Sequence, residues 1–337
     1  MFKSGVWNDF FDVQDQRLKE LASIVPKLVL SSKQDNTVKS YLSGFNRWKK
    51  WALQFPEVTI LPAQPKHVAM YLASVIQNSK THSPVLNSFY SISWAHKLAC
   101  VDDPTLHDIV KKVKESSSRI LGVGHNSKEP VTPQILFDLC SLYGSLNASL
   151  KDLRILSICV LAYSGFLRFD EFSNLLHSDL FFAEGYMTVF IERSKTDTSR
   201  VGKRVFISNT KSQCCPVKIV KRYIQAAGFA KDSQLYLFRA LTYHKKRNIY
   251  TLRKQNKGLT YTSTREVVLN AFGSVGLDVK QFGTHSMRKG GATAAASNHV
   301  CDRLIKKHGR WQSENSKDLY ISEDLAQKLA VSRNLGI

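Results

Sequence analysis

Residues 163–172 decide how the second half of this chain folds, and they read Tyr163-Ser164-Gly165-Phe166-Leu167-Arg168-Phe169-Asp170-Glu171-Phe172. The segment before them, 150–163, is apolar nearly all round and is predicted to be a buried helix. Gly165 interrupts the pattern, and a new helix is expected to begin near Arg168, with Glu171 one turn later. Taken alone, Arg168 and Glu171 are typical of an ion pair on a protein surface.

The next charged candidate, Lys195, lies in a predicted β-hairpin. Strand-like stretches occupy 186–192 and 203–208, and the polar residues 194–202 between them are expected to form the turn. A lysine in a hairpin turn, seen by itself, is usually a solvated charge at the edge of a sheet.

Two later stretches carry the remaining candidates. His285 and Arg288 are three residues apart, so on a helix they share one face. Small residues follow Arg288 and predict close helix packing, which makes simple solvation of this arginine a poor explanation. Trp311 comes two residues after Gly309 and nine residues before Tyr320. An aromatic pair at this spacing is ordinarily part of a core.

Together these stretches resemble the tyrosine recombinase, or phage integrase, family, with a Cre- and Xer-like catalytic domain. The family is marked by an Arg in a Gly-x-x-Arg-x-x-Glu turn, a Lys on a β-hairpin and a His-x-x-Arg helix. A His or Trp after a Gly and a nucleophilic Tyr about nine residues later complete the pattern. The resemblance spans roughly 130–325 and implies these catalytic residues: Arg168, Lys195, His285, Arg288, Trp311 and Tyr320, with Glu171 in support.

One position departs from the pattern. Many members carry Gly-His where this chain has Gly309-Arg310-Trp311. His308 precedes that glycine and lies 12 residues before Tyr320, so the resemblance assigns the role to Trp311, a residue that some members use there. The segment 41–48 is similar to integrases of eukaryotic mobile elements of the DIRS or Crypton kind.

The implied chemistry suits these residue types. A tyrosyl oxygen that attacks a phosphodiester develops charge on the phosphate oxygens, and guanidinium groups present planar donor pairs to such oxygens. Arg168 and Arg288 would supply these donors, with the Trp311 N–H beside them. His285 would accept or donate a proton, and Lys195 would protonate the leaving 5′ oxygen. Guanidinium groups take the place of divalent ions, and the 3′-phosphotyrosyl bond retains the phosphodiester energy, so we expect no metal and no cofactor.

The pattern of helices and linkers predicts two domains and a mainly α fold with a small β-sheet. The assignments are a leader at 1–35, a four-helix, SAM-like core-binding domain that clamps DNA at 36–118, a linker at 119–131, and an α+β catalytic domain at 132–337. Beyond Pro216 the chain is expected to be helical to its end. A final helix at about 322–333 fits either donation to a neighbouring subunit or packing on its own domain.

The charge of the chain favours a nucleic-acid partner. Subtracting 27 acidic from 48 basic residues gives +21. Residues 128–337 hold 32 basic and 17 acidic residues, a net +15, and residues 1–127 hold 16 and 10, a net +6. We expect phosphate contacts from Arg47, Lys49, Lys50, Arg200, Lys203, Lys245, Lys246, Arg247, Arg253, Lys254 and Lys289.

Several classes of protein are disfavoured. No apolar run approaches 18 residues, and the start of the chain does not read as a secretion signal. The six cysteines are scattered and read as reduced thiols, so Cys214-Cys215 is not expected to bind metal.

The sequence therefore predicts an intracellular, site-specific DNA recombinase or integrase, nuclear if its host is a eukaryote. Its expected partners are double-stranded DNA and three copies of itself, as a homotetramer on paired sites. Two alternatives stay open: a domesticated DNA-binding protein that has lost catalysis, and an enzyme like a type IB topoisomerase.

Overall fold

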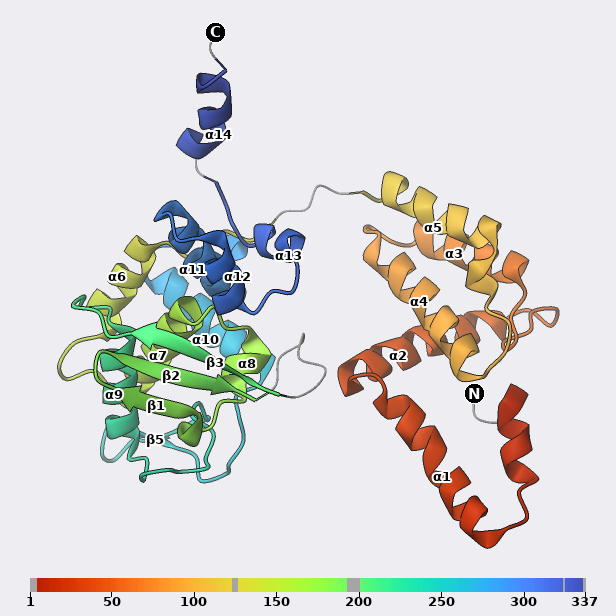
Figure 1. The fold of residues 1–337 in the computed structure, drawn as a ribbon, viewed down its shortest axis with the longest axis horizontal. Helices are drawn as coiled ribbons and strands as arrows, with labels where there is room; N and C mark the ends of the chain where they lie inside the picture. Colours follow the sequence, from red (N-terminus) through yellow and green to blue (C-terminus); the bar gives the residue numbers. More distant parts are fainter. Residues whose placement is uncertain (1–4, 123–126, 193–200, 324, 336–337) are drawn as a thin grey trace. The chain divides into compact units, whose positions relative to one another are not determined.

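The computed structural model describes residues 5–122, 127–192, 201–323 and 325–335. The chain forms two compact units, Met1–Asn126 and Ser127–Ile337, here called the N-terminal and C-terminal units (Figure 1). Their boundary falls inside the segment 119–131 that the sequence favours as a linker. The two ends of that segment behave differently: Ile120 closes a helix, whereas Glu129 and Val131 donate backbone hydrogen bonds of 2.8 and 2.9 Å to the C-terminal unit.

The N-terminal unit is a small helical bundle. Trp48 is fully buried at its centre, and its indole N–H donates to the carbonyl of Ile60 at 3.0 Å. Leu72 and Ile92, also fully buried, pack in the same core. The elements are η1(Gly5–Phe11), α1(Gln16–Ser31), α2(Asp35–Ala52), α3(Pro65–Gln77), α4(Ser83–Leu98), η2(Pro104–Leu106) and α5(Asp108–Ile120).

The first 35 residues are more ordered than the weak periodicity of the leader predicts. Helix α1 forms there, and Trp7 is buried, with its indole N–H bonded to the carbonyl of Leu98 at 2.6 Å. No residue of α1 is buried, and Leu18, Leu21 and Leu28 are more than half exposed. Apolar residues do recur at three- and four-residue spacing here, at Leu18, Leu21, Val25 and Leu28, and this signal was overlooked because Pro26 interrupts it.

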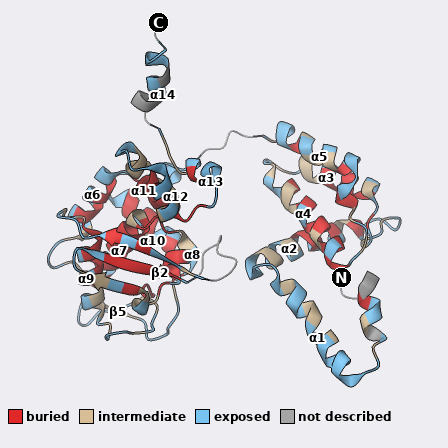
Figure 2. Ribbon diagram, in the orientation of Figure 1, coloured by how far each residue is buried: buried red, intermediate tan, exposed pale blue. Residues whose placement is uncertain are grey.

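The C-terminal unit surrounds one buried helix, α7(Leu150–Ser164). Figure 2 shows α7 as buried along most of its length, and Leu156, Ile158 and Leu161 are at most 1% exposed. The other helical elements are α6(Pro133–Tyr143), α8(Phe169–Ser173), η3(His177–Asp179), α9(Pro216–Ala227), α10(Tyr261–Ser274), η4(Val279–Gln281), α11(Ser286–Ser297), α12(Asp302–Gly309), α13(Glu314–Asp318) and α14(Leu325–Arg333).

The β-structure consists of a three-stranded sheet and a separate hairpin. Strands β1(Leu180–Ala183), β2(Tyr186–Ile191) and β3(Lys203–Ser208) are antiparallel in that order, with Val189 opposite both Leu180 and Val205. The expected hairpin of β2 and β3 is present, and β1 extends it.

The expectation of continuous helix beyond Pro216 is wrong. Strands β4(Leu241–His244) and β5(Ile249–Leu252) form a second antiparallel hairpin there. Each strand has only four residues, and the basic residues Lys245, Lys246 and Arg247 lie between them, so the pattern is too short to separate from a charged surface segment.

Helix α11 approaches α7 closely because it presents glycines to it. A Cβ atom on Gly291 would lie 2.2 Å from the carbonyl oxygen of Tyr163, and one on Gly290 would lie 1.9 Å from the carbonyl of Val131. This approach brings the His285 and Arg288 end of α11 next to the turn that follows α7.

We expect Gly291→Ala to destabilise the C-terminal unit by about 1–3 kcal/mol, because the backbone of α7 must shift to admit the methyl group. Differential scanning calorimetry of the full chain measures the change. Gly273→Ala, in α10, is the matched control: its Cβ would meet nothing closer than Val279 at 3.4 Å, so we expect a neutral effect or a gain of about 0.4–1 kcal/mol. Equal losses in both variants would contradict the close packing of α11 on α7.

Candidate active site

The site begins at the turn between α7 and α8. Gly165 ends α7, and Phe166 adopts a left-handed backbone conformation with φ of 46°. Arg168 then precedes α8, and its backbone N–H and its Nη1 donate to the two carboxylate oxygens of Glu171 at 2.8 and 2.9 Å. The Glu171 side chain is 1% exposed and the Arg168 side chain 14% exposed, so this is no surface ion pair.

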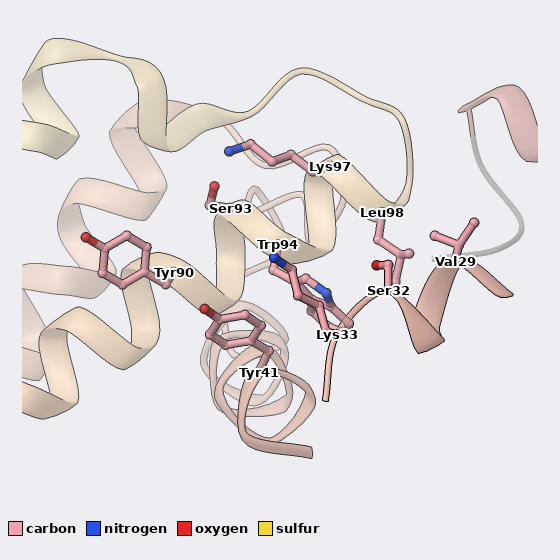
Figure 3. Close-up of a pocket in the computed structure, with 9 residues that line it drawn as sticks. All are labelled: Val29, Ser32, Lys33, Tyr41, Tyr90, Ser93, Trp94, Lys97 and Leu98. Atoms are coloured by element: carbon pink, nitrogen blue, oxygen red, sulfur yellow. The ribbon is translucent and has the colours of Figure 1, made fainter. Parts of the chain in front are cut away.

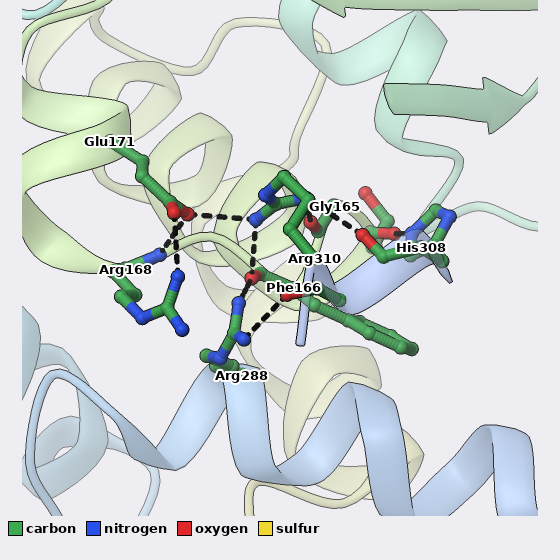
Figure 4. A network of polar contacts seen from close by, with 9 residues as sticks. Gly165, Phe166, Arg168, Glu171, Arg288, His308 and Arg310 are labelled. Atoms are coloured by element: carbon green, nitrogen blue, oxygen red, sulfur yellow. Dashed lines mark hydrogen bonds and ion pairs between the residues drawn. The ribbon is translucent and has the colours of Figure 1, made fainter. Parts of the chain in front are cut away.

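Arg288 reaches the same turn from α11. Its guanidinium is fully buried and donates to the carbonyl of Phe166 and, at 2.6 Å, to the carbonyl of Gly309. The Arg168 side chain lies close by (Figure 4). Burial lowers the pKa of Arg288 to about 9, and the charge of Arg168 lowers it as well. Arg288 is therefore still a cation at neutral pH.

Trp311 and Tyr320 stack on Arg288. The guanidinium carbon lies 4.2 Å from the centre of the Trp311 ring and 5.0 Å from that of the Tyr320 ring, and the two ring centres are 5.3 Å apart. The exposed His285 lies on the other side of Tyr320, with a ring separation of 6.4 Å. The motif residues of three stretches, 163–172, 285–288 and 309–320, are thus in contact or nearly so.

The backbone of Tyr320 is anchored within its own subunit. The Thr293 hydroxyl, on α11, donates to the carbonyl of Tyr320 at 3.3 Å and accepts from the N–H of Ser322 at 3.1 Å. Lys317, whose side chain is 3% exposed, lies 2.7 Å from a carboxylate oxygen of Asp302 on α12, and its carbonyl accepts from the N–H of Tyr320 at 2.8 Å. The candidate nucleophile is therefore held over Arg288 of the same chain. Sequence reasoning assigned no role to Thr293 or Lys317.

A third arginine, Arg310, completes the site and was also missed (Figure 4). It follows α12 with a left-handed φ of 58° and is fully buried. Its Nη2 donates to Glu171 at 2.7 Å and to the carbonyl of Phe166 at 2.9 Å, and its Nη1 donates to the carbonyls of His308 at 2.7 Å and Gly165 at 3.1 Å. The only signal in the sequence was the departure from Gly-His at this point.

Glu171 balances these cations. Burial raises the pKa of its carboxyl, but the charge of Arg310, the backbone N–H of Arg168 and the charge of Arg168 outweigh burial, so the pKa lies below its ordinary value. Glu171 is therefore ionised wherever the chain is folded near neutral pH.

Some predicted residues do not join the cluster. Lys195 and Arg200 lie outside the described residues. His308 hydrogen-bonds through Nε2 to the carbonyl of Ser164 at 2.8 Å, in agreement with the choice of Trp311 over it. Lys289 donates to Ser127 and Lys128 at 3.0 and 2.9 Å, so it ties the start of the C-terminal unit to α11.

The other basic candidates lie on surfaces. Lys245, Lys246 and Arg247 are exposed between β4 and β5, and Arg253 and Lys254 are in the stretch after β5. Lys203 is exposed at the start of β3. In the N-terminal unit Arg47 and Lys50 line an open groove of about 460 Å³ along α2, with Lys49 exposed beside Lys50.

A further cavity in the N-terminal unit was not foreseen. It measures about 310 Å³ and is lined by Tyr41, Tyr90 and Trp94, with Lys33 and Lys97 among its other side chains (Figure 3). None of the motif residues contributes to it.

The comparisons with known proteins agree with this geometry. Residues 137–326 match the phage integrase family. The chain belongs to that family. It is 27% identical over 329 residues to an integrase/recombinase XerD homologue of Selenomonas ruminantium, covering 96% of this chain and 92% of that one. It is 23% identical to the Cre recombinase of Escherichia phage P1, covering 85% and 84% of the two chains.

Solved structures of phage integrase family members share the fold. The XerH recombinase bound to a palindromic difH substrate gives a TM-score of 0.60 at 13% identity, covering 96% of this chain and 90% of that one. The Tn1549 transposon integrase gives 0.58 at 15% identity, covering 90% and 95%. The prediction of a tyrosine recombinase with a mainly α fold and a small β-sheet is confirmed. Among the described residues, no helix is long and apolar enough to cross a membrane.

Replacing Glu171 by Gln removes the charge that balances Arg310, and we expect a loss of about 3–5 kcal/mol of unfolding free energy at pH 7. Because the pKa of Glu171 is lowered by folding, its stabilisation is present above the unfolded-state pKa and is lost as pH falls through the folded-state value. The difference in unfolding free energy between wild type and Glu171→Gln should therefore shrink below about pH 4.5. Urea unfolding of both proteins at pH 7, 5 and 4 measures this difference.

The control is Glu266→Gln, because Glu266 is exposed on α10 and should give no gap at any pH. A gap for Glu171→Gln that stays constant down to pH 4 would show that charge balance is not the role of this carboxylate.

Proposed function

We propose that this tyrosine recombinase cleaves and rejoins double-stranded DNA at specific sites, with Tyr320 as nucleophile and a 3′-phosphotyrosyl bond as intermediate. The observation that carries the proposal is the stacking of Tyr320 and Trp311 on the buried Arg288, beside the Arg168–Glu171 pair. A tyrosine held against the guanidinium of Arg288 is suited to attack a phosphate that Arg288 and Arg168 both bind.

Arg168 and Arg288 hold the oxygens of the phosphate as charge develops on them during attack. A free phenol is ionised only about once in a thousand molecules at neutral pH, so the attacking oxygen needs a proton acceptor and nearby positive charge. Exposed His285, next to the Tyr320 ring, accepts that proton, and Arg288 stabilises the resulting anion.

Entry of the phosphate requires the Tyr320 side chain to move. Arg288 is fully buried, and the indole N–H of Trp311 is buried with no hydrogen-bond acceptor among the described residues. Both lie against the Tyr320 ring. Rotation of that ring, with its backbone kept in place by Thr293, opens both donors to a phosphate oxygen.

Lys195 acts on the leaving group. We assign to it the proton that the departing 5′ oxygen needs, because the sequence predicts this lysine in the polar turn that joins two strands, as the family pattern requires of the general acid. The reaction as proposed uses no metal and no cofactor, since the guanidinium groups supply the positive charge.

DNA is held by both units. We propose that residues 36–118 clamp one side of the duplex through the α2 groove of Arg47 and Lys50, and that the β4–β5 turn and Lys203 bind phosphates for the catalytic domain, 132–337. The sharing of fold with XerH bound to its difH substrate and with a λ integrase tetramer on a Holliday junction, at a TM-score of 0.55, supports a homotetramer on paired DNA sites. Such an enzyme acts inside the cell, and in the nucleus of a eukaryote.

Tyr320→Phe removes only the attacking oxygen, so the variant should bind DNA with unchanged affinity and form no covalent complex. The measurement is an SDS-stable protein–DNA adduct on nicked suicide substrates made from the flanks of the gene. Tyr261→Phe is the matched control, because Tyr261 is an exposed tyrosine of the same unit at the start of α10.

An adduct formed by the Tyr320→Phe variant would reject Tyr320 as the nucleophile. Binding without an adduct from wild type would favour the non-catalytic DNA-binding alternative, and relaxation of supercoiled DNA by the monomer would favour the topoisomerase alternative.

Removing Lys245, Lys246 and Arg247 together should flatten the dependence of log Kd on log salt concentration by up to about three, roughly one unit for each phosphate that is no longer neutralised. Fluorescence anisotropy with duplex DNA between 50 and 300 mM salt, a range of about sixfold, gives the slope. Removing Arg17, Lys19 and Lys27, exposed on α1, changes the net charge equally and serves as control. The same slope in both triple variants would show that the basic residues of the β4–β5 turn are solvated charges that do not contact phosphates.

A further inference from the structure

Arg310 contacts both phosphate-binding arginines indirectly, through acceptors that it shares with them. With Arg168 it shares the carboxylate of Glu171, and with Arg288 it shares the carbonyl of Phe166 (Figure 4). Each of its two Nη atoms makes two hydrogen bonds to protein acceptors, whereas each Nη of Arg288 makes one, and its side chain is 1% exposed. The terminal N–H groups of Arg310 are therefore already used within the protein and are not placed to touch DNA. Any effect of Arg310 on the reaction must therefore act through its neighbours.

The two oxygens of Glu171 are used unequally. Oε1 accepts from Arg168 Nη1 at 2.9 Å. Oε2 accepts from Arg310 Nη2 at 2.7 Å and from the backbone N–H of Arg168 at 2.8 Å. An arginine next to a carboxylate commonly forms two parallel hydrogen bonds, one to each oxygen. Here the second oxygen is occupied, and Arg168 contacts the carboxylate through one side-chain nitrogen.

The balance of charges also depends on Arg310. Arg168, Arg288 and Arg310 with Glu171 give three positive charges and one negative, a net of +2 around the phosphate position. Without Arg310 the net falls to +1, and Glu171 is left as a buried anion whose remaining counter-charge is mainly Arg168. A buried carboxylate attracts its remaining partner strongly, because an unpaired charge costs several kcal/mol there.

We propose that Arg310 is a positioning residue: by occupying Oε2 of Glu171 and balancing its charge, it keeps Arg168 from closing a two-bonded fork on that carboxylate. The outer guanidinium nitrogen of Arg168 is then available to a phosphate oxygen of the DNA. This inference rests on the proposed function, because it assigns Arg310 a part in the same phosphate site.

The first test is Arg310→Gln, which keeps a polar side chain and removes the charge. Cleavage, measured as the rate of adduct formation at saturating suicide DNA, should fall on the order of a hundredfold, the effect of losing one donor to the reacting oxygens. DNA affinity should stay within about twofold, because most of it comes from other phosphate contacts. Arg310→Lys restores the charge and should be clearly faster than Arg310→Gln.

The decisive variant carries both Arg310→Gln and Glu171→Gln. Removing the anion releases Arg168, so the double variant should cleave roughly tenfold faster than Arg310→Gln alone, as expected for two groups that interact directly. A purely structural role predicts the reverse, since two damaged buried positions are worse than one. Rates are compared at a temperature at which circular dichroism shows every variant folded.

Arg154→Gln is the matched control for the loss of a buried arginine. Arg154 is buried in α7 and donates to the carbonyl of Arg239 at 2.7 Å, away from the cluster. The Arg154→Gln substitution should lower thermal stability without slowing cleavage by the folded protein.

The outcomes separate the two claims. If wild type forms no adduct, the proposed function fails. If wild type does form it, the inference about Arg310 is overturned by either of two results: Arg310→Gln that cleaves at the wild-type rate, or a double variant no faster than Arg310→Gln. Should the double variant not fold, the comparison of Arg310→Lys with Arg310→Gln decides, and equal rates would overturn the inference.

Discussion

The carbonyl oxygen of Phe166 accepts hydrogen bonds from two guanidinium groups, those of Arg288 and Arg310, and the rest of the site depends on this shared acceptor. Two cations converge on one buried atom only if an anion lies near, and Glu171 is that anion. The left-handed backbone at Phe166 directs the carbonyl between them. The chemistry of the site is therefore set first by a backbone turn, and the side chains are arranged around it.

Two packing features bring the remaining parts to that turn. The glycine face of α11 allows it to approach α7 at backbone distance, which places Arg288 next to the carbonyl of Phe166. Lys317 lies within 2.7–3.4 Å of carboxylate oxygens of Asp302, Glu314 and Asp318, and so fixes the short helix α13 that leads into Tyr320. Close helix packing positions Arg288, which binds the phosphate, and a cluster of charges positions Tyr320, the nucleophile.

The sequence predicted those parts of the site in which residue type and spacing are themselves the signal. Arg168, Arg288 and Tyr320 lie in one cluster, and the helix with the strongest apolar pattern, α7, ends within one residue of its expected bounds. Arg310 was overlooked because three of its four acceptors are backbone carbonyls, which leave no pattern in the sequence. The β4–β5 hairpin was missed for a different reason: each strand has only four residues, and the basic turn between them dominates the pattern of the segment.

The nature of these acceptors has an evolutionary consequence. Backbone carbonyls at 165, 166, 308 and 309 are present whatever side chains occupy those positions, so point mutation cannot delete them directly. Glu171 is the side-chain acceptor that Arg168 and Arg310 share, and a single codon change can remove it. Among these acceptors, vulnerability to point mutation therefore rests on one carboxylate, while the carbonyls persist as long as the backbone path is kept.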